Sequence, residues 1–115
     1  MSDKCYPNLV EQYSENDSWV IVFEAPKDLV YFDGHFDQAA VLPGVVQLTW
    51  AEYYGRGHFK FQGKFSHLEA IKFQNVIVPE QRVSLTLRYE AEKGKLHFRF
   101  ESDSGRHSSG RFVFV

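Results

Sequence analysis

The residues best suited to chemistry lie in one short stretch of the chain. Gly34-His35-Phe36 places a histidine among glycine, aspartate and aromatic residues, and Val41-Leu42-Pro43-Gly44-Val45 follows. A neutral imidazole works as a general base near neutral pH. Pro43 suits the first turn of a helix, where N–H groups are unpaired and the helix dipole favours negative charge. The stretch therefore combines a candidate base with a candidate donor to a developing anion.

The element that must position these residues is the helix that follows them. The segment PGVVQLTWAEYY is apolar on nearly every face, which predicts a central helix from Pro43 to about Tyr54 that other elements wrap. Gly55-Arg56-Gly57 is expected to end it. Asp28 to Leu42 shows neither a helical nor a strand period and is interpreted as a shaped loop, a kind of segment that is often functional.

The rest of the chain is expected to be mainly β-structure, because 17% of its residues are aromatic. Pro7–Tyr13 is interpreted as a short helical lead-in, Ser14–Ser18 as a turn, and Ser102–Gly110 as a polar loop. A connection is expected from Gly55 to Phe65, and a turn at Lys93-Gly94. The strands are expected at Trp19–Ala25, Ala70–Val78, Arg82–Glu90, Leu96–Phe100 and Arg111–Val115.

Composition excludes several classes of protein. The net charge of −2 gives no electrostatic footprint for nucleic acid. The first twenty residues hold no continuous apolar stretch, which predicts neither a signal peptide nor a membrane span. One cysteine, Cys5, cannot form an internal disulfide and agrees with a cytoplasmic location.

The expected order of elements predicts an α+β architecture in a single domain spanning residues 1–115. One strand, one long apolar helix and a four-strand meander most economically form an antiparallel sheet wrapped around one helix. Such a sheet leaves a face and an edge that need cover. Pairing with a second subunit supplies that cover, so a dimer is expected.

The stretch around the histidine resembles a known family. Gly34-His35-Phe36, a spacer, and Val41-Leu42-Pro43-Gly44-Val45 at a helix start are similar to the β-hydroxyacyl-acyl-carrier-protein dehydratases of the hotdog superfamily. Ile71–Pro79 is similar to the family's strand after the helix. Pro43–Leu48 followed by Trp50-Ala51 is most similar to the branch that acts in aryl-polyene pigment synthesis.

The resemblance implies an activity and roles for particular residues. The reaction is loss of water from a 3-hydroxyacyl thioester on acyl carrier protein, giving the trans-2-enoyl thioester without a metal or organic cofactor. His35 matches the family's base, and the Gly44 N–H matches the donor to the enolate oxygen. The carbonyl of Val41 matches the group that orients the histidine ring. Around these residues, Phe36, Pro43 and Val45 are expected to contact the substrate.

The sequence departs from the family at the acid. The family places Asp or Glu fourteen residues after the histidine, and this position is Thr49. Threonine exchanges hydrogen bonds but holds no proton for release near neutral pH. Three sources of the acid stay open: a water or β-hydroxyl oriented by Thr49, the carboxylate of Glu52 one helical turn further on, or a carboxylate from a different hotdog subunit in a heterodimer.

Other reactive side chains have simpler interpretations. Asp33 and Asp37 are more typical of turn capping than of orienting His35. Ser108 and Ser109 lack the context of a nucleophile elbow. The remaining histidines are expected on the surface or in packing, and none has metal-ligand spacing: His58, His67, His97 and His107. Five cations have two open interpretations, a basic patch that meets an acidic carrier protein or scattered charges that solvate the surface: Arg56, Lys60, Lys64, Lys72 and Arg82.

The leading hypothesis from the sequence is therefore a dehydratase that works as a homodimer or as a heterodimer with another hotdog subunit. Two alternatives remain open, because hotdog domains host several activities. One is a thioesterase that uses a carboxylate and water. The other is a non-catalytic subunit whose partner carries out the chemistry.

Overall fold

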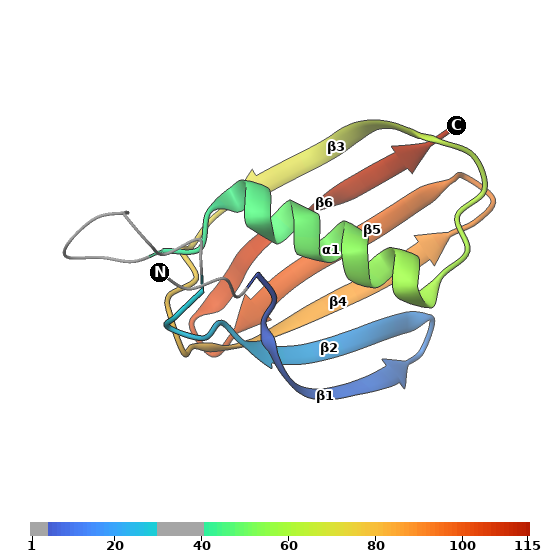
Figure 1. Cartoon of the computed structure of the whole chain (residues 1–115). Coiled ribbons are helices and arrows are strands. Elements are labelled where there is room, and N and C mark those ends of the chain that lie inside the picture. The colour runs from blue at the N-terminus through green and yellow to red at the C-terminus, as the bar shows by residue number, and fades with distance from the viewer. Residues whose placement is uncertain (1–4, 30–40) are drawn as a thin grey trace.

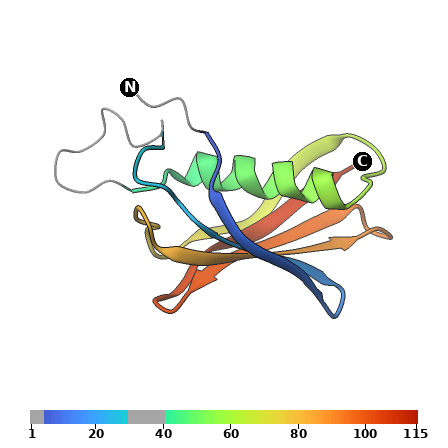
Figure 2. The same cartoon turned by 60° about the horizontal axis from the view of Figure 1, so that its bottom comes forward.

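The protein folds as an antiparallel sheet with one helix lying across it. The structure, a computed structural model, describes residues 5–29 and 41–115. The elements of these residues are β1 (Asn8–Glu15), β2 (Ser18–Glu24), α1 (Gly44–His58), β3 (Phe65–Phe73), β4 (Arg82–Glu90), β5 (Lys95–Ser102) and β6 (Gly105–Phe114). The strands form one sheet in the order β1-β2-β4-β5-β6-β3, and α1 crosses one face of it (Figure 1). Figure 2 shows the sheet curving beneath the helix. The expected hotdog arrangement is confirmed.

Alternating apolar residues explain how the sheet holds the helix. Val83, Leu85 and Leu87 of β4 are buried, and their neighbours in the strand are more exposed. β5 repeats the pattern with Leu96, Phe98 and Phe100. Side chains two residues apart in a strand share a face, so both strands present an apolar face to α1. β2 is buried on both faces, as its β-branched and aromatic composition predicts.

One face of α1 completes this core. Val46, Trp50 and Ala51 are buried, and the Trp50 ring packs edge-on against Phe23 of β2 at 5.5 Å between ring centroids. The opposite face is exposed: the side chain of Val45 is 68% exposed and that of Tyr53 is 51% exposed. The helix carries apolar residues on nearly every face, but the sheet covers only one of these faces. The apolar residues on the opposite face stay exposed in the described part of the chain.

The helix is longer than predicted, because the glycines at its end do not stop it. α1 continues through Gly55-Arg56-Gly57 and ends at His58. A β-carbon on Gly55 would lie 2.6 Å from Cδ2 of the buried Leu96 side chain and 3.3 Å from Phe61 Cζ. Gly55 is thus a point of close approach between α1 and β5, and the expectation that it ends the helix was wrong.

The first strand was also mispredicted. Residues 8–15 form β1, an edge strand paired with β2, instead of the short helix expected at Pro7–Tyr13. Every residue of β1 is exposed, so the strand has no buried face that would produce an alternating pattern. Backbone pairing with β2, which a hydrophobic pattern does not report, determines its structure.

The strands after the helix differ from the prediction in two ways. β4, β5 and β6 form the expected meander, but β3 pairs with β6 at the far edge instead of lying next to β4. β3 spans Phe65–Phe73, earlier than the predicted Ala70–Val78. Most of the expected polar loop at Ser102–Gly110 is in fact the beginning of β6. Ser108 and Gly110 are buried there, under the helix side of the sheet, so their small size reflects packing instead of a loop.

β3 leaves an exposed edge. Its side chains are almost all exposed, including Phe65 at 46% and Phe73 at 52%. An open strand edge with exposed aromatic side chains is the kind of surface that proteins usually cover.

The described residues contain no helix long and apolar enough to cross a membrane.

Candidate active site

The backbone turns into the helix between Val41 and Gly44, and this turn is called the corner below. Leu42 enters it with its N–H bonded to the Ile77 carbonyl at 2.8 Å, and Pro43 is the extended residue before the helix. The N–H groups of Val46 and Gln47 return to the Pro43 carbonyl at 3.1 and 3.2 Å. No side chain among the described residues caps the helix. The first N–H groups of a helix have no partner within it, so the predicted role of the Gly44 N–H as a donor stays a prediction that this helix start is compatible with.

A pocket of about 480 Å³ opens at this corner. One wall is the helix start, formed by Val41 to Gly44 and Gln47, and the other is the segment from Phe73 to Val76 that leaves β3. A β-carbon on Gly44 would lie 2.8 Å from the Phe73 ring. The Phe73 ring therefore packs directly against the helix start, and a side chain at residue 44 would require this exposed ring to shift.

The structure brings together some of the predicted site residues and not others. Val41, Pro43 and Gly44 line the pocket. Val45 does not, and its side chain is largely exposed. His35 and Phe36 lie outside the described residues. The predicted backbone features therefore meet in one place, together with Gln47 and Phe73, which the sequence interpretation did not select.

Gln47 lies beneath the corner and is almost fully buried, with 3% of its surface exposed. Its side-chain nitrogen donates to the Leu42 carbonyl at 3.3 Å, and its side-chain oxygen accepts from the Ser108 hydroxyl at 2.6 Å. A carbonyl only accepts hydrogen bonds, so the Leu42 contact determines which end of the amide is which. The amide thus ties the chain before α1 to β6. The signal for it in the sequence is a polar residue within an otherwise apolar helical segment.

The other wall is held by a buried histidine. The His107 carbonyl accepts the Gln74 N–H at 2.8 Å, and the Asn75 side chain donates to the Arg106 carbonyl at 2.8 Å. The His107 ring is fully buried, with Nε2 at 2.6 Å from the Ser102 hydroxyl and Nδ1 at 3.4 Å from the Asn75 carbonyl. His107 therefore has a packing role, one of the two expected.

The two helix residues considered for the acid step, Thr49 and Glu52, do not line the pocket. The Thr49 hydroxyl donates to the carbonyl of Val45 in the preceding turn at 2.9 Å, and its side chain is exposed. Glu52 accepts from Arg56 at 2.9 Å, with the two side chains 39% and 52% exposed. No Asp or Glu is among the described residues that line the pocket. The described chain thus offers a hydrogen-bond donor at the corner without an acid beside it.

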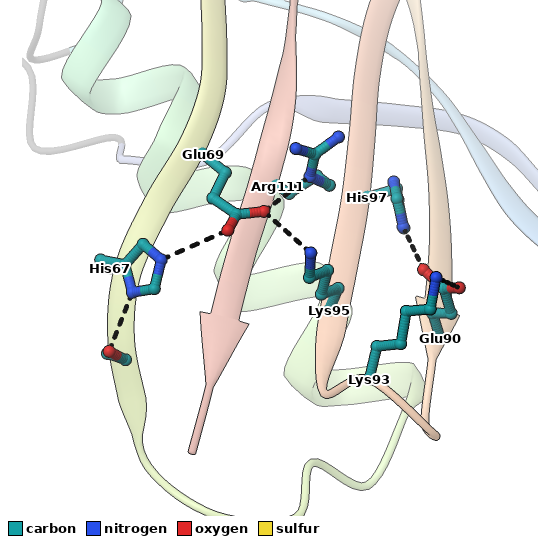
Figure 3. Close-up of polar contacts among 8 residues, drawn as sticks. His67, Glu69, Glu90, Lys93, Lys95, His97 and Arg111 are labelled. Carbon is teal, nitrogen blue, oxygen red and sulfur yellow. Dashed lines mark hydrogen bonds and ion pairs between the residues drawn. The ribbon is translucent and has the colours of Figure 1, made fainter.

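Two carboxylates with lowered pKa values lie away from the pocket, on the helix-free face of the sheet (Figure 3). Glu69 accepts from Arg111 at 3.0 Å and lies 3.1 Å from the Lys95 amine. Hydrogen bonds, first from Lys95 and then from Arg111, lower the pKa of Glu69 from 4.5 to about 2. His97, at 2.9 Å, is the main cause of a lowered pKa at Glu90. These pairs cross-link the strands on the face away from the pocket.

The basic patch predicted for a carrier protein is not one surface. Arg56 and Lys60 line a depression near the end of α1, but Lys72 lines a hollow on the helix-free face of the sheet. Arg82 forms a 2.8 Å ion pair with Glu24. The prediction failed because it grouped cations by sequence segment without knowing that β3 would lie at the far edge of the sheet. No group of side chains suited to hold a metal ion occurs among the described residues.

Comparison with known proteins adds a family to this geometry. A family model described as ApeI-like, ApeI dehydratase, matches residues 11–111. The dehydratase heterocomplex ApeI:P from Xenorhabdus doucetiae contains a similar chain, with 26% identity and a TM-score of 0.87, covering 96% of this chain and 98% of that one.

Two further solved structures are similar. An uncharacterized protein from Erwinia carotovora subsp. atroseptica is 28% identical with a TM-score of 0.82, and the match covers 96% of each chain. The dehydratase domain of the polyketide protein PpsC from Mycobacterium tuberculosis shares the fold at 17% identity, with a TM-score of 0.69 over 96% of this chain and 44% of that one. No curated protein sequence matches the chain.

Proposed function

The chain belongs to the family of ApeI-like dehydratases, and from that premise we propose that it dehydrates a 3-hydroxyacyl thioester carried on acyl carrier protein. The product is the trans-2-enoyl thioester. We further propose that the chain works in the cytoplasm, as one domain spanning residues 1–115, in synthesis of a fatty-acid or aryl-polyene chain. The observation that carries the proposal is the uncapped helix start at Gly44, opening into a pocket.

The reaction assigns distinct tasks to the groups around the thioester. In this proposal His35 takes the proton from the α-carbon, and the electron pair moves into an enolate. The Gly44 N–H donates to the enolate oxygen, where the helix dipole also favours negative charge. An acid then protonates the β-hydroxyl, the carbon–oxygen bond breaks, and water leaves as the enoyl double bond forms. No metal or organic cofactor enters these steps.

The pocket is suited to this use of Gly44. The nitrogen lies on a wall that Gln47 and Ile77 hold by hydrogen bonds to both polar groups of Leu42. A donor that is held before the substrate arrives needs no reorganisation when charge develops. The Val41 carbonyl at the pocket wall would orient the His35 ring, and Pro43 would contact the acyl chain.

The acid is proposed to come from a second hotdog subunit. Neither side chain of the two helix residues Thr49 and Glu52 lines the pocket: the Thr49 hydroxyl donates to the Val45 carbonyl, and Glu52 forms an exposed ion pair with Arg56. The similar chain from Xenorhabdus doucetiae belongs to a dehydratase heterocomplex. The exposed β3 edge, with Leu68 at 37% and Phe73 at 52%, would pair with such a partner and bring its carboxylate to the pocket.

The alternative supported by the same observations is a non-catalytic subunit. A chain without the family's acid at Thr49 could shape the acyl site while its partner supplies every reacting group. The two functions differ in what His35 does. If the chain supplies the base, the assembled complex needs His35; if it only shapes the site, the complex does not.

Mass spectrometry of a 3-hydroxyacyl carrier protein tests the proposal. The purified chain is assayed alone and with a hotdog subunit that carries an Asp or Glu at the position of the family's acid. We expect loss of water with the partner present and a decrease of about 10²–10⁴-fold after His35→Ala. Undiminished loss of water in the His35→Ala complex would establish the non-catalytic alternative. Release of free acid and carrier thiol would instead identify a thioesterase.

A further inference from the structure

The face of the sheet opposite α1 holds a hollow of about 320 Å³ that the proposed dehydration does not use. Figure 3 views the sheet from this side, with the helix behind it. The hollow spans the outward-facing residues of β4, β5, β6 and β3. Its lining includes five cations, which are Lys72, Arg88, Arg99, Arg106 and Arg111.

This concentration of positive charge does not follow from composition. The chain has 13 Lys and Arg against 15 Asp and Glu, for a net charge of −2. The hollow nevertheless takes five of the cations, and its lining contains no Asp or Glu. A concave surface with one sign of charge attracts ions of the opposite sign more strongly than a flat one.

Carboxylates near the rim neutralise only part of this charge. Arg111 pairs with Glu69 at 3.0 Å, and Arg99 pairs with Glu101 at 2.9 Å. None of the ion pairs found in the described part of the chain involves the other three cations, Lys72, Arg88 and Arg106, although Arg88 is close enough to Glu90 to contribute to the lowered pKa of that carboxyl. Like charges that lie together repel one another. A bound anion would therefore reduce the repulsion among the lining cations that the nearby carboxylates do not neutralise.

The strand register places four of the five cations, all except Arg106, in two parallel rows. One row crosses the sheet from Thr86 to Arg99, Ser109 and Lys72. The other crosses from Arg88 to His97 and Arg111, and then reaches Glu69 on β3, the carboxylate that pairs with Arg111. Neighbouring strands lie about 4.8 Å apart, so the backbone positions of the two cationic residues in each row are about 10 Å apart, with a hydroxyl or imidazole residue between them.

This spacing distinguishes between ligands. A single phosphate group reaches one cation and its neighbour, but a ligand with two or more such groups reaches both ends of a row. The guanidinium fork matches two phosphate oxygens at once, and the Ser109 and Thr86 hydroxyls add donors. A β-bulge in β3 between Glu69 and Lys72, with Ala70 at a φ of 53°, opens that side of the hollow.

We propose that this hollow is a binding site for a small ligand carrying at least two phosphate groups. The site is separate from the helix start, so its occupancy does not depend on the dehydratase activity. An acidic protein segment is the other anion that a basic surface attracts. The concave shape and the two-row spacing favour a compact ligand.

Isothermal titration at constant ionic strength tests this site with inorganic tripolyphosphate and orthophosphate as probes. We expect one tripolyphosphate per chain, bound at least about tenfold more tightly than orthophosphate because it reaches several cations. Lys72→Gln and Arg88→Gln each remove a cation that is in no ion pair, and each should weaken tripolyphosphate binding about fivefold.

Arg82→Gln is the matched control, since it removes one positive charge from the same sheet outside the hollow. Its affinity should stay within about twofold of wild type, because exposed charges at a distance are screened by salt. Equal weakening by all three variants, or equal affinity for both probes, would show diffuse surface charge and overturn the proposal. Binding of a polyglutamate peptide without binding of tripolyphosphate would overturn it in favour of a protein partner.

Discussion

The Ser108 hydroxyl of β6 donates a 2.6 Å hydrogen bond to the side-chain oxygen of Gln47 in α1, and both residues are buried. The other end of the same amide holds the Leu42 carbonyl. Because Leu42 also donates to Ile77, the chain entering the helix is fixed by bonds from two sides. Two residues 61 positions apart therefore determine how the helix start faces the pocket.

Removing one member of this pair should destabilise the fold. Ser108→Ala leaves the Gln47 oxygen buried without a donor, which typically lowers the free energy of unfolding by about 1–3 kcal/mol. Urea denaturation followed by circular dichroism measures it. Gln47→Leu combined with Ser108→Ala removes both partners of this bond, and although the Leu42 carbonyl also loses its donor, the double variant should be less unstable than the sum of the two single variants. A double variant as unstable as the sum of the single ones would show that the bond contributes nothing.

Two glycines of α1 should respond in opposite ways to the same substitution. Gly55→Ala places a methyl group against the buried Leu96 side chain and should lower the free energy of unfolding by about 1–3 kcal/mol. Gly57 has no atom within 4 Å of the position of a β-carbon, so Gly57→Ala should stabilise the helix by about 0.5–1 kcal/mol. Thermal unfolding of the two variants checks both signs, and stabilisation by Gly55→Ala would contradict the packing argument.

A strand was predictable from the sequence where burial of one of its faces produces an alternating hydrophobic pattern. β4 alternates because one side faces α1, and its predicted bounds, Arg82–Glu90, are the observed ones. β1 has no buried side, so its pairing with β2 left no pattern to detect. The glycines near the end of α1 were interpreted as a helix stop, since a stop and a close contact select the same residue. Contacts with distant strands, which the local sequence does not contain, decide between the two.

The site was predictable to a similar extent. Pro43-Gly44 indicated a helix start from local conformation alone, and the structure places it at a pocket. Phe73 and Asn75 reach the same pocket only because β3 pairs with β6 at the far edge of the sheet. That pairing is a long-range property of the fold. No spacing within the sequence could bring these residues to Gly44.

Acid should weaken the cross-strand network at Glu69 over a defined range. The pKa of Glu69 is lowered from 4.5 to about 2 in the folded chain, mainly by Lys95 and then by Arg111. A lowered pKa means that the contribution to stability is complete above the unfolded pKa, near 4.5, and is lost as the pH falls towards 2. Wild type should therefore be more stable than Glu69→Gln at pH 7, and the difference should shrink between about pH 5 and 2.

Urea denaturation at several pH values measures this difference, and an NMR titration of the Glu69 carboxyl measures the pKa directly. Glu11→Gln is the matched control, because Glu11 lies on the exposed strand β1 and takes part in no ion pair in the described part of the chain. Its stability difference from wild type should change little over the same range. A difference for Glu69→Gln that is constant with pH would show that the network does not hold the carboxylate charged.

The two helix residues nearest to the family's acid position should prove dispensable for dehydration. Glu52→Gln is expected to keep a rate close to wild type in the assembled complex, because its carboxylate is held by Arg56 and is absent from the pocket lining. Thr49→Val should behave likewise, since its hydroxyl donates to Val45 instead of to the pocket. A partner variant lacking its carboxylate should lose activity by about 10²–10⁴-fold, as expected for removal of a general acid. Single-turnover mass spectrometry separates these cases. Loss of the reaction in Glu52→Gln with an unchanged partner would show that Glu52 of this chain supplies the acid.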